Sequence, residues 1–152
     1  MEPLELGRLT DRKPPFKYSA LTRVGFSDTD AQGIVYYGRY MPYFDLARVE
    51  YLRALDLLRP GPEGEQFVAR ALQVEYLAPA RFDDELEIDV RVARIGTSSV
   101  SFEWAAYLRG EVLAAKATQT VVLVDLAKRE PCRVPDWWRE KIRELEGDDL
   151  EA

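Results

Sequence analysis

The sequence predicts an α+β fold in which an antiparallel β-sheet wraps around one long central helix, in the order β-α-β-β-β-β with a short C-terminal helix. Three observations predict it: an early segment with alternating side chains, apolar residues at helical spacing after it, and four further strand-like segments joined by short turns. At 152 residues the chain has the size of one domain. We expect that domain at residues 17–146, an N-terminal arm with one short helical turn at residues 1–16, and an acidic tail at residues 147–152.

The first strand is predicted at residues 17–26 and the long helix at residues 40–59. Alternate residues of the strand segment share one face, as expected for a strand with one buried side: Tyr18, Ala20, Thr22, Val24 and Phe26. Apolar residues of the helix recur every three or four positions: Tyr40, Phe44, Ala47, Tyr51, Leu55 and Leu58. Because further apolar residues widen this stripe, the helix should be covered on most sides.

Four long strands are predicted at residues 67–77, 85–94, 98–108 and 112–124. Glycine turns at positions 96 and 110 join two pairs of them closely, which indicates an antiparallel meander. In residues 86–92, apolar side chains alternate with Glu87, Asp89 and Arg91. A short amphipathic helix at residues 136–146 should end at Gly147. One sheet face and the sheet edges stay uncovered in this arrangement, which favours a homo-oligomer.

Composition excludes several classes of function. The net charge of −6 gives no general attraction for nucleic acid or anionic lipid. With no histidine and only Cys132, the chain cannot form a Ser-His-Asp triad, a histidine-ligated metal site, an intrachain disulfide or a cysteine-rich zinc site. The first residues lack the apolar stretch of a signal peptide, and no segment is apolar over the length of a membrane span. A cytoplasmic protein is expected.

Three segments together carry a resemblance to a known family. Residues 26–48, F-S-D-T-D-A-Q-G-I-V-Y-Y-G-R-Y-M-P-Y-F-D-L-A-R, are the most specific of them. Residues 74–86, V-E-Y-L-A-P-A-R-F-D-D-E-L, form a second block, and I-G-T-S-S-V-S-F-E with T-V-V-L-V-D completes the set. This pattern resembles the 4-hydroxybenzoyl-CoA thioesterase family of hotdog-fold acyl-CoA thioesterases. The resemblance runs from about residue 18 to residue 137.

The resemblance implies a catalytic site at residues 30–37. It places the catalytic carboxylate at Asp30, the glycine of the turn at Gly33, and the backbone N–H that polarises the thioester carbonyl at Tyr37. It further implies dimers with active sites at the subunit interface, commonly paired into tetramers. Coenzyme A is then part of the substrate, and neither a separate cofactor nor a metal is expected.

Substrate contacts are expected around this site. Residues that could line the acyl site are Tyr36, Gly38, Tyr40 and Thr118. Coenzyme A phosphates need a positive rim on this acidic protein. Three basic residues after the last long strand could form that rim and are called the basic cluster below: Lys128, Arg129 and Arg133. Arg91 and Arg94 are a second possibility.

The chemistry of this scheme does not need histidine. The start of a helix offers unpaired N–H groups and the positive end of its dipole, which can hold a developing oxyanion. An aspartate is an anion at neutral pH. Asp30 can therefore attack the thioester as a nucleophile or activate a water as a general base, and both routes stay open. Asp28 is interpreted as a structural loop residue, and Asp45 with Arg48 as an ion pair on the helix surface.

Two alternatives to an acyl-CoA thioesterase keep the same fold. Acyl carrier protein could be the acyl donor, and a protein-docking basic rim would support that reading. A non-catalytic acyl-CoA-binding protein would be expected to carry an attached regulatory domain. The acyl group could be aromatic, short or long, because pocket depth depends on side chains of two subunits.

Overall fold

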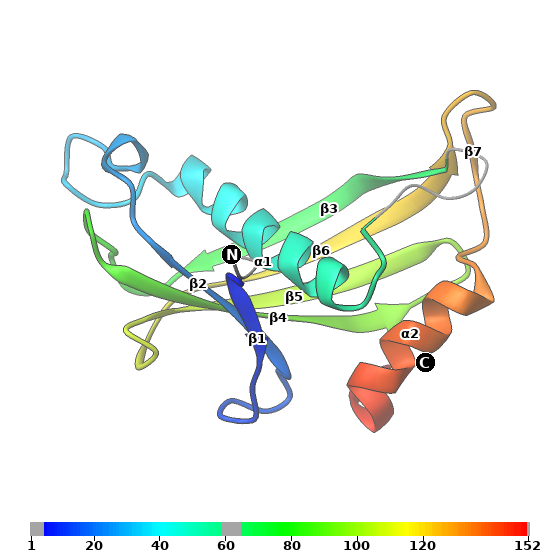
Figure 1. Cartoon of the computed structure of the whole chain (residues 1–152). Helices are drawn as coiled ribbons and strands as arrows, with labels where there is room; N and C mark the ends of the chain where they lie inside the picture. The colour runs from blue at the N-terminus through cyan, green and yellow to red at the C-terminus, as the bar shows by residue number, and fades with distance from the viewer. Residues whose placement is uncertain (1–4, 59–64, 152) are drawn as a thin grey trace.

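The computed structural model describes residues 5–58 and 65–151 and has the predicted order of long elements (Figure 1). Its strands are β1 (Gly7–Leu9), β2 (Tyr18–Arg23), β3 (Gln66–Tyr76), β4 (Glu85–Ile95), β5 (Ser99–Leu108), β6 (Val112–Asp125) and β7 (Glu130–Pro131). Its α-helices are α1 (Tyr40–Ala54) and α2 (Asp136–Glu146), and its short 3-10 turns are η1 (Phe26–Asp28), η2 (Tyr37–Arg39) and η3 (Gly147–Asp149). The four long strands begin and end within one residue of the predictions, and α2 has the predicted bounds.

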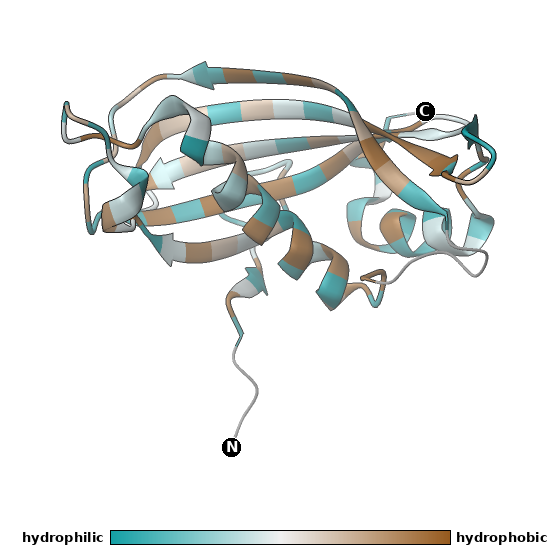
Figure 2. Ribbon diagram, turned by 90° about the horizontal axis from the view of Figure 1, so that it is seen from above, coloured by the Kyte–Doolittle hydropathy of each residue, from teal (hydrophilic) through white to brown (hydrophobic). Residues whose placement is uncertain are grey.

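All strands belong to one antiparallel sheet with the order β1-β2-β4-β5-β6-β3, and β7 pairs with β6 outside this path. The helix α1 lies along one face of the sheet, and α2 lies beyond the C-terminal end of α1 (Figure 1). Apolar and polar bands alternate along the long strands (Figure 2), as the period of two requires. This is the predicted fold class.

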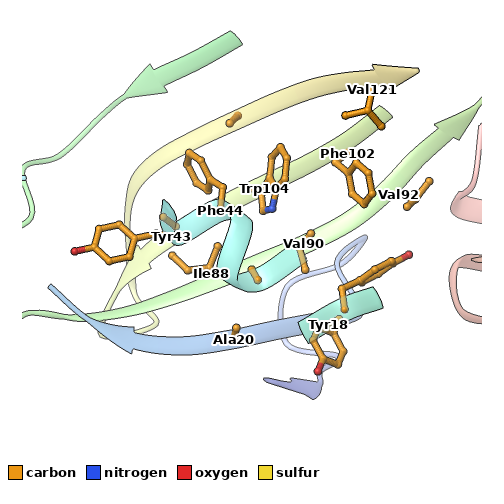
Figure 3. Packing of buried hydrophobic residues seen from close by; sticks show 14 of the residues in the cluster. Tyr18, Ala20, Tyr43, Phe44, Ile88, Val90, Val92, Phe102, Trp104 and Val121 are labelled. Atoms are coloured by element: carbon orange, nitrogen blue, oxygen red, sulfur yellow. The ribbon is translucent and has the colours of Figure 1, made fainter. Parts of the chain in front are cut away.

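The core lies between α1 and the sheet. The side chains of Phe44, Ala47 and Tyr51 are fully buried on the inner face of α1. Figure 3 shows Phe44 beside Trp104, and their ring centroids are 5.4 Å apart. Side chains from three strands complete this layer: Ala20, Ile88, Val90, Val92 and Phe102. A single sheet face therefore buries the helix, as its wide apolar surface predicts.

The first strand and the long helix are shorter than predicted. Strand β2 ends at Arg23, and Phe26 is 78% exposed in η1 instead of lying on the sheet face. Helix α1 ends at Ala54, because Asp56 adopts a left-handed φ of 57° and the N–H of Leu57 donates to the carbonyl of Leu52 at 2.8 Å. This reversal of the chain buries Leu57. Arg59, the predicted end, lies outside the described residues.

The N-terminal segment contains a strand instead of the expected helical turn. Strand β1 pairs with β2, and the following residues cross the outer face of the sheet. There Arg12 and Lys13 both bind the Glu87 carboxylate, with Lys13 at 2.7 Å. Because of this cover, the polar side of β4 is buried: Glu87 is 2% exposed and Asp89 is 0% exposed. At the other end of the chain, Glu151 bonds back to β4.

Asp89 should make the stability of the protein depend on pH. Neither of its carboxylate oxygens has a hydrogen-bond partner among the described residues. Burial raises the pKa of Asp89 from 3.8 to about 6, against the lowering effect of Lys13 and Arg12. Because its pKa is higher in the folded protein, folding favours the protonated form of Asp89. The contribution of Asp89 to stability is therefore fully present below pH 3.8 and is lost as the pH rises through about 6.

Replacement of Asp89 by asparagine removes this titration. We expect the variant to gain in Tm relative to the wild type as the pH rises from 4 to 8, measured by thermal unfolding at several pH values. The same change at the exposed Asp148 is the control and should leave the pH profile unchanged. An Asp89→Asn profile parallel to that of the wild type would contradict the titration.

Candidate active site

The segment from Thr29 to Val35 forms a tight hairpin that presents Asp30. The N–H of Asp30 donates to the carbonyl of Ile34 at 2.9 Å, and the N–H of Gly33 donates to the carbonyl of Asp30 at 2.9 Å. Gly33 has a φ of 79°, and no atom lies within 4 Å of where a Cβ would stand. Glycine is therefore required there by the backbone angle and not by lack of space.

The Asp30 carboxylate is held by one of its two oxygens. Its Oδ1 accepts the N–H of Gln32 at 2.8 Å, which closes an Asx-turn. Its Oδ2 has no hydrogen-bond partner among the described residues, and the side chain is half-buried. One oxygen thus orients the group while the other can react.

Directly after this hairpin the chain enters η2 and α1 with two unpaired N–H groups. The N–H of Tyr36 donates to the carbonyl of Asp28 at 2.9 Å, and that of Arg39 donates to the carbonyl of Tyr36 at 2.8 Å. For the N–H groups of Tyr37 and Gly38, the described part of the chain offers no acceptor. Such groups at the start of a helix can bind a negatively charged oxygen.

Asp28 fixes the position of this segment. The Tyr43 hydroxyl on α1 donates to its carboxylate, and Arg39 Nε donates to Oδ1 at 3.0 Å. The N–H of Gly25 donates in turn to the Tyr43 hydroxyl at 3.3 Å. Burial, and then the bond to Asp28, raises the pKa of Tyr43 to about 12, so it stays a donor at neutral pH. The structural interpretation of Asp28 agrees with these contacts, whereas the sequence analysis did not single out Tyr43.

Four tyrosines, here called the tyrosine cluster, surround the start of the helix: Tyr36, Tyr37, Tyr40 and Tyr76. The rings of Tyr36 and Tyr37 are 4.4 Å apart, and the Tyr76 hydroxyl on β3 donates to the carbonyl of Tyr37 at 3.1 Å. The pKa of Tyr36 is raised, first by its hydrogen bond with Tyr37 and least by the charge of Asp30. Tyr40 is buried, whereas the other three rings are exposed.

Comparison with known proteins defines the family. The family described as the thioesterase-like superfamily matches residues 24–142. The chain belongs to the thioesterase-like superfamily. This membership confirms the resemblance and the enzyme class of a thioester hydrolase.

Individual relatives are similar over most of their length. The chain is 36% identical over 121 residues to a Haemophilus influenzae protein called acyl-CoA thioesterase YbgC, which covers 78% of this chain and 88% of that protein. A Thermus thermophilus thioesterase solved with coenzyme A and Zn is 33% identical, with a TM-score of 0.73 over 85% of this chain and 94% of that one. A thioesterase superfamily structure from Jannaschia, 23% identical with a TM-score of 0.80 over 91% of this chain and 89% of that one, supports the fold.

In this thioesterase chain Thr118 does not lie with Asp30. The side chain of Gln119 bonds to Arg48 of α1, so Gln119 is on the inner face of β6. Its neighbour Thr118 must then point to the outer face, because side chains alternate along a strand. Within the chain, Thr118 therefore lies on the sheet face away from α1, and its predicted contact with an acyl group beside Asp30 stays a prediction.

The basic cluster also lies apart from Asp30 within the chain. The Asp30 hairpin contacts Ala80 and Arg81, just before β4, whereas residues 128–133 follow the far end of β6 (Figure 1). Strand β6 has 14 residues, which corresponds to roughly 45 Å. Arg133 pairs there with Asp136 at 2.8 Å. The alternative, Arg91, is 7% exposed and bonds to Glu103.

Within residues 5–58 and 65–151, no three His, Cys, Asp or Glu side chains gather as a metal site. In the same residues, no helix is long and apolar enough to cross a membrane.

Tyr43→Phe is expected to lower kcat/KM for thioester hydrolysis about tenfold, because the Asp28 carboxylate loses a hydrogen-bond donor and the segment at residues 28–39 loses this contact with α1. Steady-state kinetics and Tm are measured together. Tyr107→Phe, on the outer sheet face, is the matched control and should leave kcat/KM within about twofold. A Tyr43→Phe enzyme with unchanged kcat/KM would contradict the positioning role.

Proposed function

We propose that the chain hydrolyses an acyl-CoA thioester to a carboxylic acid and free coenzyme A. The observation that carries the proposal is the arrangement of the helix start: a half-buried Asp30 carboxylate with one unpartnered oxygen stands on the same short segment as two unpaired N–H groups. The names of the relatives and the coenzyme A complex of the Thermus thermophilus structure support the choice of thioester.

In the proposed mechanism, the N–H groups of Tyr37 and Gly38 donate to the thioester carbonyl oxygen and stabilise its developing charge. As a nucleophile, an Asp30 oxygen bonds to the carbonyl carbon, the C–S bond breaks, coenzyme A leaves as a thiolate, and water hydrolyses the resulting anhydride. As a general base, Asp30 takes a proton from a water that attacks the same carbon, and the same thiolate leaves. Both routes need the ionised carboxylate.

We further propose that the active form is a dimer joined through β3. Among the described residues, β3 pairs only with β6, and its other edge is free. Large apolar side chains on and after this strand are exposed: Phe67, Val68, Leu72, Tyr76 and Leu77. A long apolar edge of this kind favours pairing with a second copy. The tetramer expected from the family resemblance would be a pair of such dimers.

Antiparallel pairing of two β3 strands also bears on coenzyme A. It reverses one protomer, so that the end of β6 in the partner lies on the side of the Asp30 hairpin. The partner's basic cluster would then approach the Asp30 site, whereas the basic cluster of the same chain is distant from it. This geometry supports a role of the cluster with the coenzyme A phosphates.

The test is release of free thiol from a panel of acetyl-, butanoyl-, dodecanoyl- and benzoyl-CoA, with one acyl carrier protein thioester beside them. Hydrolysis of at least one coenzyme A thioester is expected. If the protein binds these thioesters without hydrolysing any, the enzymatic proposal is wrong. If it prefers the carrier protein thioester, the acyl donor is acyl carrier protein and not coenzyme A. Light scattering on the same sample should show at least a dimer, and a stable monomer would contradict the β3 interface.

A further inference from the structure

A large apolar cavity lies at the end of α1 opposite to Asp30. Its volume is about 420 Å³, and it opens between the C-terminal half of α1, the first half of β3 and the start of α2. Its lining is mostly apolar and includes Leu52, Leu57, Phe67, Phe102, Val121 and Trp138. Arg48 is the first cavity residue on α1, and it follows Tyr37 by eleven residues, or about 17 Å along a helix. The cavity is thus separate from the catalytic segment of its own protomer.

The one arginine that lines this cavity in the described part of the chain, Arg48, is already engaged by side chains of the same chain. Arg48 Nη1 donates to the side-chain oxygen of Gln119 at 2.6 Å, and Nη2 pairs with Asp45. The guanidinium carbon lies 5.6 Å from the ring centroid of Phe102. The expectation of a simple ion pair on the helix surface is therefore incomplete, because Arg48 also bridges α1 and β6. Because Arg48 is paired with Asp45 and bonded to Gln119, and the rest of the lining is mostly apolar, the cavity suits an uncharged apolar group.

Helix α2 closes one end of the cavity. The Trp138 ring is 5% exposed, and its centroid lies 5.3 Å from that of Phe67 on β3. Ile142, one turn later, is fully buried, which fixes this part of α2 against the core. A ligand that enters from the β3 edge would therefore meet a rigid aromatic wall.

The dimer of the proposed function connects this cavity with a catalytic segment. Two β3 strands (Gln66–Tyr76) that pair antiparallel about their midpoint, Ala71, place Gln66 of one protomer opposite the partner's Tyr76. Gln66 and Phe67 line the cavity, and Tyr76 bonds to the Tyr37 carbonyl in each protomer. In a dimer paired in this register, each cavity would face the Asp30 segment of the other protomer.

We propose that this cavity is the acyl pocket for the thioester bound at the partner's Asp30, and that its residues determine the length of the acyl chain. The inference rests on the proposed function and on the β3 dimer. At about 30 Å³ for each water-sized group, the volume holds on the order of 14 such groups, so a saturated, uncharged acyl chain of roughly 10–14 carbons fits. Trp138 sets the end of the pocket.

Two matched variants on α1 test the proposal. Leu46 and Leu52 are both half-buried and packed against the core, but only Leu52 lines the cavity. Leu52→Trp fills part of the cavity, and Leu46→Trp makes the same change outside it. The measurement is kcat/KM for butanoyl-CoA and dodecanoyl-CoA with each protein.

The wild type should prefer dodecanoyl-CoA, because each buried methylene raises kcat/KM by about fourfold. We expect Leu52→Trp to lower kcat/KM for dodecanoyl-CoA at least about tenfold and that for butanoyl-CoA less than about threefold, whereas Leu46→Trp keeps the wild-type ratio. If Leu52→Trp does not fold, the pair Leu52→Phe and Leu46→Phe is measured in the same way.

Failure of the inference can be told from failure of the proposed function. A wild type that hydrolyses acyl-CoA but prefers the butanoyl group overturns the acyl pocket alone. The same conclusion follows if Leu52→Trp leaves the chain-length ratio unchanged. A wild type that hydrolyses no acyl-CoA overturns the proposed function itself.

Discussion

Asp30→Asn is expected to lower kcat for acyl-CoA hydrolysis by about 100- to 10,000-fold, which is the usual contribution of a catalytic acid–base or nucleophilic group. Asparagine keeps a side-chain oxygen that can accept the N–H of Gln32, so the turn at residues 30–33 should persist. What it removes is the negative charge and with it both proposed routes. The measurement is steady-state release of free thiol, with Tm recorded to show that the fold is intact.

Asp125 offers a matched control for this variant. Its Oδ1 accepts the N–H of Ala127 at 3.0 Å, two residues on, which is the contact that Asp30 makes with Gln32. Asp125 is not one of the residues proposed to contact the thioester, and asparagine keeps an oxygen that can accept the same N–H, so Asp125→Asn should leave kcat within about twofold. Asp30→Asn activity close to that of the wild type would remove Asp30 from the mechanism, whatever the fold.

The fold could be predicted from the sequence where the spacing of apolar residues matches the face that the element buries. Strands β4, β5 and β6 and helix α2 have a clear period and clear turns, and their bounds follow from these signals. The end of α1 could not be predicted in this way, since Leu55, Leu57 and Leu58 continue the apolar pattern of the helix. The positive φ of Asp56 reverses the chain and buries Leu57 from a turn. In the sequence, a leucine that is buried from a turn cannot be told from a leucine that continues the helix.

In the candidate site, too, only the residues that are close in sequence could be predicted to lie together. Asp30, Gly33 and Tyr37 lie on one contiguous segment, so a motif could place them together. Tyr76 comes from β3, about forty residues later, and its contact with Tyr37 depends on how the sheet seats α1. A strand with alternating period adds a second difficulty, because a shift of one residue exchanges the two faces. That shift separates Gln119, which reaches α1, from Thr118, which does not.

Glu146→Ala is expected to have the largest effect on stability, a loss of about 2–5 kcal/mol in the free energy of unfolding. Glu146 is fully buried at the end of α2, and its Oε2 accepts both the Tyr51 hydroxyl at 2.6 Å and the N–H of Val92 at 3.1 Å. Its removal leaves two buried donors, one on α1 and one on β4, without an acceptor. Urea unfolding of the variant and the wild type measures the loss.

Two further variants of α2 separate this loss from a general effect on the helix. Glu144→Ala is the same change at an exposed position of α2 and should cost less than about 0.5 kcal/mol. Glu146→Gln keeps an acceptor for Tyr51 and should cost less than Glu146→Ala. Burial raises the pKa of Glu146 above its ordinary value of 4.5, so folding favours the protonated form of Glu146. The wild type therefore loses the stability that protonated Glu146 contributes as the pH rises through the raised pKa. The cost of Glu146→Gln should therefore be smaller at pH 8 than at pH 4, and a cost that grows with pH would mean that the buried carboxylate is stabilised in its charged form.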